Sequence, residues 1–189
     1  MYGFPPVKFL PGGLLMLSML VFFTDMYLLA ALLGNVILHE LGHIYCLKSC
    51  GVYIRCVKIG FTGLCIQCSL ERLSPRAYFL CAAAGPAVGL LAAFATSFIG
   101  NILNNEFLLL FAGCGLILST FNLLPVRPLD GWRMLSCVWP KGVGVVGDLT
   151  ASAIFGIGVC MMLQGYGTML VCLGIFFLLQ GRKDTFFVR

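Results

Sequence analysis

The chain alternates between long apolar runs and short polar breaks along its 189 residues. A helix needs about 20 apolar residues to cross the hydrocarbon core of a bilayer. Asp25 and Pro140 stand in two of the breaks, where a charge or a missing amide interrupts an apolar helix. The pattern predicts an all-α polytopic membrane protein of about six transmembrane helices, at residues 9–24, 27–49, 76–99, 106–138, 144–163 and 167–181. The first is expected to be a retained helix, because no small-x-small cleavage site follows it.

The longest polar connection, residues 50–75, has a different pattern. The stretches 52–59 and 64–68 are rich in β-branched and apolar residues, and Gly60 and Gly63 lie between them. This arrangement predicts a β-hairpin after the second helix. Because the hairpin is too apolar for a free loop, we expect it to be associated with the membrane and shielded by protein.

Composition supports a membrane location. The chain is 60% hydrophobic and 10% charged, whereas soluble domains average about 45–50% apolar and about 25% charged residues. This excludes a soluble fold and a disordered chain. We expect one domain over 1–189, with a core at about 27–138 and C-terminal helices at about 144–181.

The chain has a net charge of +5. The positions of the positive residues indicate how the chain is oriented in the membrane. Ten of the 12 Lys and Arg residues fall in segments that six spans place on one side of the membrane, whereas Arg127 and Arg133 lie within the fourth span. The positive-inside rule then predicts that both termini are cytosolic and that the chain binds a lipid bilayer and no nucleic acid. The ten are Lys8, Lys48, Arg55, Lys58, Arg72, Arg76, Lys141, Arg182, Lys183 and Arg189.

Both histidines of the chain lie in one apolar span. His39 and His43 are four residues apart, with Glu40 between them. On a helix this spacing places both imidazoles on one face, where they can bind one metal ion, and Glu40 lies beside it as a candidate general base. Zinc suits two imidazoles and a carboxylate, with water at the fourth position. Ionisable side chains within a span are costly and usually functional, which favours a metal site over a structural role.

The third ligand is predicted to be Asp130. It is the one carboxylate inside a long apolar span, and Pro125, Pro128 and Gly131 interrupt the helix around it. His43 and Asp130 lie about six and about eight residues from the inner ends of their spans, so both are expected roughly 10 Å below the cytosolic surface. The sequence therefore predicts one zinc ion per chain.

These motifs resemble a known family. The segment 39–43, followed about 80 residues later by Asn122 with Pro125 and by Leu129-Asp130-Gly131, is similar to the site-2 proteases, and most closely to their small sporulation-factor-processing branch. The Ala84-Gly85-Pro86 segment resembles another element of that family. The resemblance implies that His39, His43 and Asp130 bind zinc, that Glu40 is the catalytic base, and that Asn122 contacts substrate or the oxyanion.

One position departs from the family pattern, and other residues leave alternatives open. Many members carry Asn three residues after the Gly-Pro pair, where this chain has Gly89. Arg127 and Arg133 either extend to the cytosolic face or hold Asp130 or the oxyanion. The 10 cysteines are expected to act mainly as small apolar residues. Cys46 and Cys50 continue the histidine helix at i+4 spacing, and Cys65 and Cys68 form a CxxC pair, a weak metal or redox signal.

The expected function is intramembrane zinc proteolysis in a bacterial cell membrane. The substrate would be a transmembrane protein, such as a membrane-bound transcription-factor precursor or an anti-sigma factor, and regulated cleavage would release a cytosolic fragment. Two non-enzyme classes stay open. A metal transporter would need polar groups along a path through the bilayer, whereas here they gather at one depth. A catalytically silent zinc-binding scaffold would not need Glu40.

Overall fold

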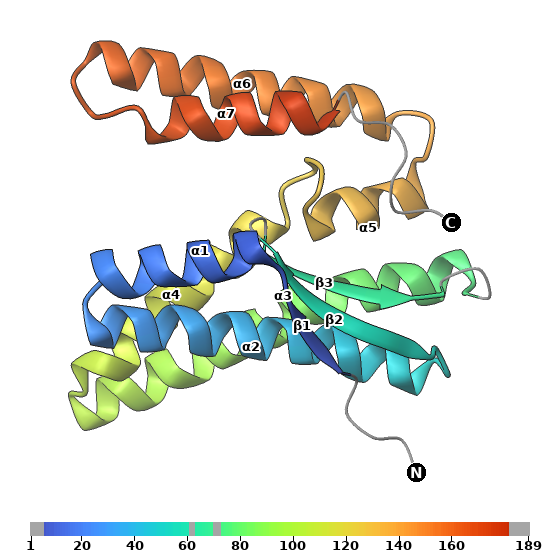
Figure 1. Cartoon of the computed structure of the whole chain (residues 1–189), viewed down its shortest axis with the longest axis horizontal. Coiled ribbons are helices and arrows are strands. Elements are labelled where there is room, and N and C mark those ends of the chain that lie inside the picture. The colour runs from blue at the N-terminus through green and yellow to red at the C-terminus, as the bar shows by residue number, and fades with distance from the viewer. Residues whose placement is uncertain (1–5, 61–62, 70–72, 182–189) are drawn as a thin grey trace. The chain divides into compact units, whose positions relative to one another are not determined.

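The computed structural model describes residues 6–60, 63–69 and 73–181, which form seven helices and one small sheet within two compact units, 1–120 and 121–189 (Figure 1). Predicted charges at Arg72, Arg182, Lys183 and Arg189 lie outside the described residues. In chain order the first unit contains β1 (Val7–Phe9), α1 (Pro11–Phe23), α2 (Met26–Ser49), β2 (Ile54–Gly60), β3 (Gly63–Cys68), α3 (Pro75–Leu103) and nearly all of α4 (Glu106–Asn122).

The longest helices of the first unit, α2 and α3, lie side by side (Figure 1). Helix α2 begins where the Asp25 carboxylate accepts a hydrogen bond from the Tyr27 amide at 3.1 Å, and the Ser74 hydroxyl caps α3 by accepting from Ala77 at 3.2 Å. Such caps satisfy amides that the first helical turn leaves without partners. Gly51, with φ of 74°, turns the chain from α2 towards β2.

The predicted hairpin is confirmed as β2 and β3, which pair antiparallel with Val57 opposite Ile66. A third strand, β1, pairs parallel to β2, with Val7 opposite Val57, and gives the sheet order β1-β2-β3. Sequence analysis missed this three-residue strand. At Gly13 in α1 a Cβ would lie 2.4 Å from the Ile59 carbonyl oxygen, so glycine allows α1 to start directly against β2.

The second unit contains α5 (Asp130–Val138), α6 (Val143–Leu163) and α7 (Met169–Gly181), and α6 and α7 pack along each other (Figure 1). Its apolar core is formed around Val126, Ala151 and Phe177. The span predicted over 106–138, with an interruption at Pro125, Pro128 and Gly131, consists of two separate helices in the structure. Helix α4 ends at Asn122, and a connection containing Pro125 and Pro128 precedes α5, because proline cannot donate the amide that a helix interior needs.

Three helices within the described residues are long and apolar enough to cross a membrane: α2, α3 and α6. Helices α1, α4 and α7 are apolar but shorter, at 10–17 residues. The structure therefore supports a membrane protein with a small sheet beside its helices, and six membrane crossings stay a prediction.

Candidate metal centre

The two histidines occupy successive turns of α2 and face the same way. Their exposed fractions are 5% for His39 and 6% for His43, and their Nε2 atoms are 3.2 Å apart. The Nδ1 atom of His43 lies 2.7 Å from the Cys81 carbonyl oxygen of α3. A carbonyl only accepts, so Nδ1 must carry the proton, and Nε2 of a neutral His43 presents its lone pair towards His39.

This geometry fits a zinc ion. Zinc binds imidazole nitrogen at about 2.0–2.1 Å in tetrahedral sites, so two such ligands lie about 3.3 Å apart. The observed separation of the two Nε2 atoms, 3.2 Å, is close to that value. Metal-binding histidines usually donate their second ring N–H to a carbonyl or carboxylate, as His43 does to Cys81. The α2 pair therefore has both the spacing and the outer hydrogen bond of a metal site.

Two glycines bring α3 against this face of α2. A Cβ on Gly42 would lie 2.6 Å from the Ala84 carbonyl oxygen, and a Cβ on Gly85 would lie 2.2 Å from Nε2 of His43. Both distances are far below van der Waals contact, so a larger residue requires the helices to move apart or, at position 85, the His43 ring to turn. The structure therefore places Gly85 directly against the His43 nitrogen that faces His39.

Two buried polar residues near the histidines were missed by sequence analysis. Asn35 is 1% exposed, one helical turn before His39, and its amide donates to the carbonyls of Ala31 and Phe111 at 2.9 Å each. Ser119 of α4 is fully buried. The Asn35 Oδ1 and Ser119 Oγ atoms have no hydrogen-bond partner among the described residues. Asn35 could have been predicted to lie on the histidine face of the helix, because it is four residues before His39. No sequence pattern marked Ser119.

The Ser119 hydroxyl occupies the space next to Gly89. A Cβ at position 89 would lie 2.2 Å from the Ser119 hydroxyl and 4.0 Å from Nδ1 of His39. The space where a side chain of residue 89 would begin is therefore occupied by a hydroxyl from α4. The polar group that many site-2 proteases carry at this position is absent, and a serine from another helix stands beside the site instead.

The other predicted site residues are placed as follows. Glu40 lies on α2 next to His39 and is partly buried, and Asn122 is the last residue of α4. Asp130 is the buried first residue of α5. The histidines and Glu40 thus belong to the first unit, and Asn122 and Asp130 belong to the second. Their union in one site stays a prediction.

Both arginines near Asp130 have partners within the second unit. The Arg133 guanidinium is 3.2 Å from Oδ1 of Asp130, which supports the interpretation that Arg133 holds this carboxylate. Arg127 instead lies 4.2 Å from the centre of the Trp132 ring, in a cation–π contact. An ion pair through Oδ1 orients Asp130 and is compatible with metal ligation through its other oxygen.

The two cysteines of the CxxC motif lie on opposite faces of one strand. Cys65 and Cys68 both lie on β3, and strand residues three apart point to opposite faces of a sheet. Cys68 packs against the apolar cluster of Leu47, Ile54 and Cys81, so Cys65 faces the other way. The two thiols therefore cannot bind one ion without unfolding the strand.

No family model matches the chain. Three curated relatives are similar to most of it, and the chain spans 38–47% of their own lengths. They are the candidate zinc metalloprotease sll0528 of Synechocystis sp. (29% identity, 76% of this chain, 38% of the relative), the zinc metalloprotease MJ0392 of Methanocaldococcus jannaschii (27%, 83% and 47%), and the candidate zinc metalloprotease Rip3 of Mycobacterium tuberculosis (28%, 81% and 44%).

A solved structure shares the fold. The site-2 protease from Methanocaldococcus jannaschii matches with a TM-score of 0.71 and 20% sequence identity, covering 100% of this chain and 95% of that one. The histidine motif, the relatives named for zinc proteolysis and the shared fold all point the same way. Together they confirm the resemblance to the site-2 protease family that the two motifs predict.

Proposed function

We propose that this chain is an intramembrane zinc metalloprotease that hydrolyses peptide bonds within or near transmembrane segments. The observation that carries the proposal is the buried histidine pair of α2, whose Nε2 atoms are 3.2 Å apart on a helix of membrane-spanning length. Glu40 lies between them in the sequence and on the same helix. A structural role would not require two imidazoles to direct their nitrogens at one point in an apolar helix.

The proposed ligands are His39, His43 and Asp130, with one zinc ion per chain. Zinc, when bound, lowers the pKa of a coordinated water towards about 7 and polarises the scissile carbonyl. Glu40 accepts the proton of the attacking water and delivers it to the leaving amine. In this proposal the Asn122 amide stabilises the oxyanion or holds substrate. The Cys81 carbonyl fixes the His43 ring, and Arg133 fixes the Asp130 carboxylate.

The proposed substrate is a transmembrane protein, with a membrane-bound transcription-factor precursor or an anti-sigma factor as the expected type. A helical substrate must unwind before hydrolysis, because helical hydrogen bonds occupy its carbonyl groups. In this proposal both termini of the chain lie in the cytosol of a bacterial cell. Because the site is predicted to lie close to the cytosolic surface, the substrate is cleaved near its cytosolic end. A cytosolic fragment would then be released.

Zinc-dependent cleavage tests the proposal. The full chain, purified in detergent, is incubated with a synthetic peptide that contains one apolar membrane segment. We expect cleavage that stops after chelation and returns when Zn²⁺ is added back. If the zinc-loaded chain binds such peptides but leaves them intact, it acts as a zinc-binding scaffold, and the protease proposal is wrong.

We predict that Asp130→Ala lowers zinc occupancy, because two imidazoles alone hold the ion less tightly than three protein ligands. The measurement is metal content per chain after gel filtration. Asp148→Ala, which removes an exposed carboxylate from α6, is the matched control and should leave occupancy unchanged. Full occupancy in Asp130→Ala would show that another residue supplies the third ligand.

We propose that an unwound substrate binds at the outer edge of the sheet, along β3. Strand β3 is an outer strand in the order β1-β2-β3. The Val57 amide donates to the Pro6 carbonyl at 3.0 Å, on the side of β1. Val57 and Ile66 therefore form a non-hydrogen-bonded pair, and the Ile66 amide points away from β2 towards the outer edge. An extended substrate can pair there by strand addition.

We predict that Ile66→Pro lowers cleavage while the chain still folds and binds zinc. Proline removes one outward donor without touching the β2–β3 ladder, and one hydrogen bond corresponds to roughly a 2- to 12-fold change in rate or affinity. Proline at Val57 would instead break the bond to Pro6 inside the sheet. Ile66→Ala retains the amide and serves as the control. Equal activity of the Pro and Ala variants would argue against pairing at this edge.

A further inference from the structure

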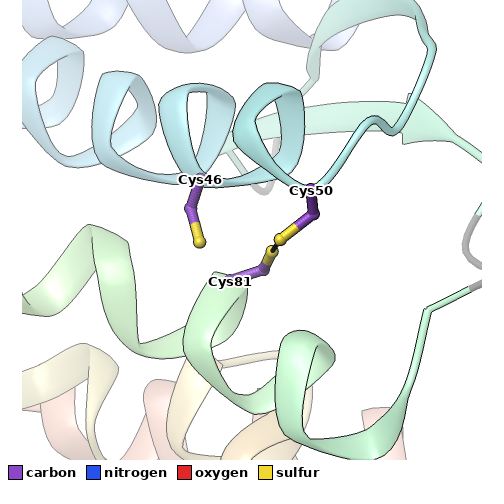
Figure 2. A group of neighbouring side chains, drawn as sticks. All are labelled: Cys46, Cys50 and Cys81. Carbon is purple, nitrogen blue, oxygen red and sulfur yellow. Dashed lines mark hydrogen bonds between the residues drawn. The ribbon is translucent and has the colours of Figure 1, made fainter.

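Three cysteine sulfurs converge in the first unit, at the end of α2 that follows the histidine pair. Cys46 lies in the last turn of α2, Cys50 is the residue that directly follows this helix, and Cys81 comes from α3 opposite them (Figure 2). All three Sγ atoms lie within 4.8 Å of one another, and those of Cys50 and Cys81 are 3.9 Å apart. Figure 2 shows the three side chains directed into the space between the two helices.

The spacing fits a thiolate metal site. Zinc binds thiolate sulfur at about 2.3 Å, so two sulfurs of a tetrahedral site lie about 3.8 Å apart. The Cys50–Cys81 distance of 3.9 Å already has this value. The i+4 spacing of Cys46 and Cys50 gives two ligands from one helix face, and α3 supplies the third. The side-chain arrangement therefore needs only small rotations to enclose one ion.

Burial is graded across the cluster. Cys81 is 4% exposed, Cys46 is partly buried, and Cys50 is exposed at the end of α2. The open side at Cys50 gives an ion an entry path and leaves room for water as a fourth ligand. Packing explains part of the cluster, because Cys46 and Cys81 contact the apolar residues around Leu47 and Ile54. It does not explain why the exposed Cys50 directs its sulfur at the other two.

We propose that Cys46, Cys50 and Cys81 form a second metal site, which binds a thiophilic divalent cation of the Zn²⁺ class with water as the fourth ligand. On binding, the three thiols release their protons to solvent, and three metal–sulfur bonds replace bonds from the ion to water. This site is separate from the histidine pair in donor chemistry, because soft sulfur ligands replace imidazole and carboxylate.

The second site is connected to the histidine pair through one residue. Cys81 offers its sulfur to the cysteine cluster, and its carbonyl oxygen accepts the hydrogen bond from Nδ1 of His43 at 2.7 Å. An ion held by Cys81 therefore fixes the backbone that orients His43. This consequence for activity rests on the proposed protease function, whereas metal binding by the three thiols does not.

Cobalt titration tests the site. The full chain is purified in detergent, reduced, freed of metal and titrated with Co²⁺, whose bonds to thiolate give a near-ultraviolet charge-transfer absorption that nitrogen and oxygen ligands do not give. We expect the intensity of this band to correspond to one thiolate-bound ion per chain and to disappear when Zn²⁺ displaces the cobalt, whereas cobalt at the histidine site adds nothing to the band. It should be lost in Cys50→Ser, an exposed substitution that spares the core, and in Cys46→Ser.

Two control variants separate this site from the rest of the chain. Cys172→Ser removes an exposed cysteine of α7 and should retain the band. His39→Ala should also retain it, even if that variant shows no proteolysis, so that failure of the protease proposal and failure of this one are distinguishable. Absence of the band in the unmodified chain, or its persistence in Cys50→Ser and Cys46→Ser, would overturn the proposal.

Discussion

The Glu40→Gln variant is expected to lose peptide cleavage by about 10²–10⁴-fold, the usual effect of removing a general base. Glutamine has nearly the same shape as glutamate and favours a helix, so α2 and its zinc site should persist. The amide cannot accept a proton from the attacking water. The rate should therefore fall while zinc content and thermal stability stay at their unmodified values.

Two further variants sharpen this experiment. Glu106→Gln makes the same chemical change at the exposed start of α4, and we expect full activity from it. His39→Ala should fail in a different way, by losing metal. Because Glu40→Gln retains its metal, it should still bind substrate and retain it through purification. Cleavage by Glu40→Gln at the unmodified rate would mean that Glu40 is not the base, and the assignment as a protease of this motif class would be wrong.

The apolar pattern predicted the main helices well because their ends have local causes. Helix α2 was expected at 27–49 and is found at Met26–Ser49, directly after the capping Asp25. The hairpin was likewise predictable from β-branched residues around two glycines. In both cases a short window of sequence contains the chemistry that starts and stops the element.

Strand β1 was missed because it depends on a distant partner. Strand β1 has three residues, too few for a periodic signal, and it forms because Val7–Phe9 pairs with β2 about 50 residues later. The end of α4 was not predicted, because residues 106–138 are apolar enough to be taken for one membrane span. Pro125 and Pro128 were recognised as interruptions, yet their effect was to end the helix rather than only to open a cavity.

The histidine pair was predictable because i+4 spacing is a property of one helix. Its surroundings were not, because they come from other helices. The Cys81 carbonyl and Gly85 reach His43 from α3, and Ser119 comes close to His39 from α4 across the gap left by Gly89. None of these contacts has a sequence spacing that marks it, so tertiary packing had to reveal them.

The second large effect is expected from Gly85→Ala. The added Cβ would lie 2.2 Å from Nε2 of His43, which is the atom that faces His39. The ring cannot turn aside freely, because its Nδ1 is bound to the Cys81 carbonyl at 2.7 Å. Either that hydrogen bond breaks or α3 moves away from α2. We expect zinc affinity to fall by about 10- to 100-fold, as it does when groups that orient a metal ligand are disturbed.

The matched control is Gly113→Ala, the same substitution in α4 at a position where an added Cβ meets nothing within 4 Å. It should leave zinc binding unchanged and stabilise its helix by about 0.5–1 kcal/mol. Zinc is titrated in a Cys50→Ser background, so that the proposed thiolate site does not contribute to the measurement. Thermal unfolding then shows whether zinc affinity falls because the site is disturbed or because the whole fold is destabilised. We expect α2 and α3 to insert and fold normally in Gly85→Ala. If that variant bound zinc as tightly as Gly113→Ala, the close contact between α3 and the His43 ring would not be what places the nitrogen for metal binding.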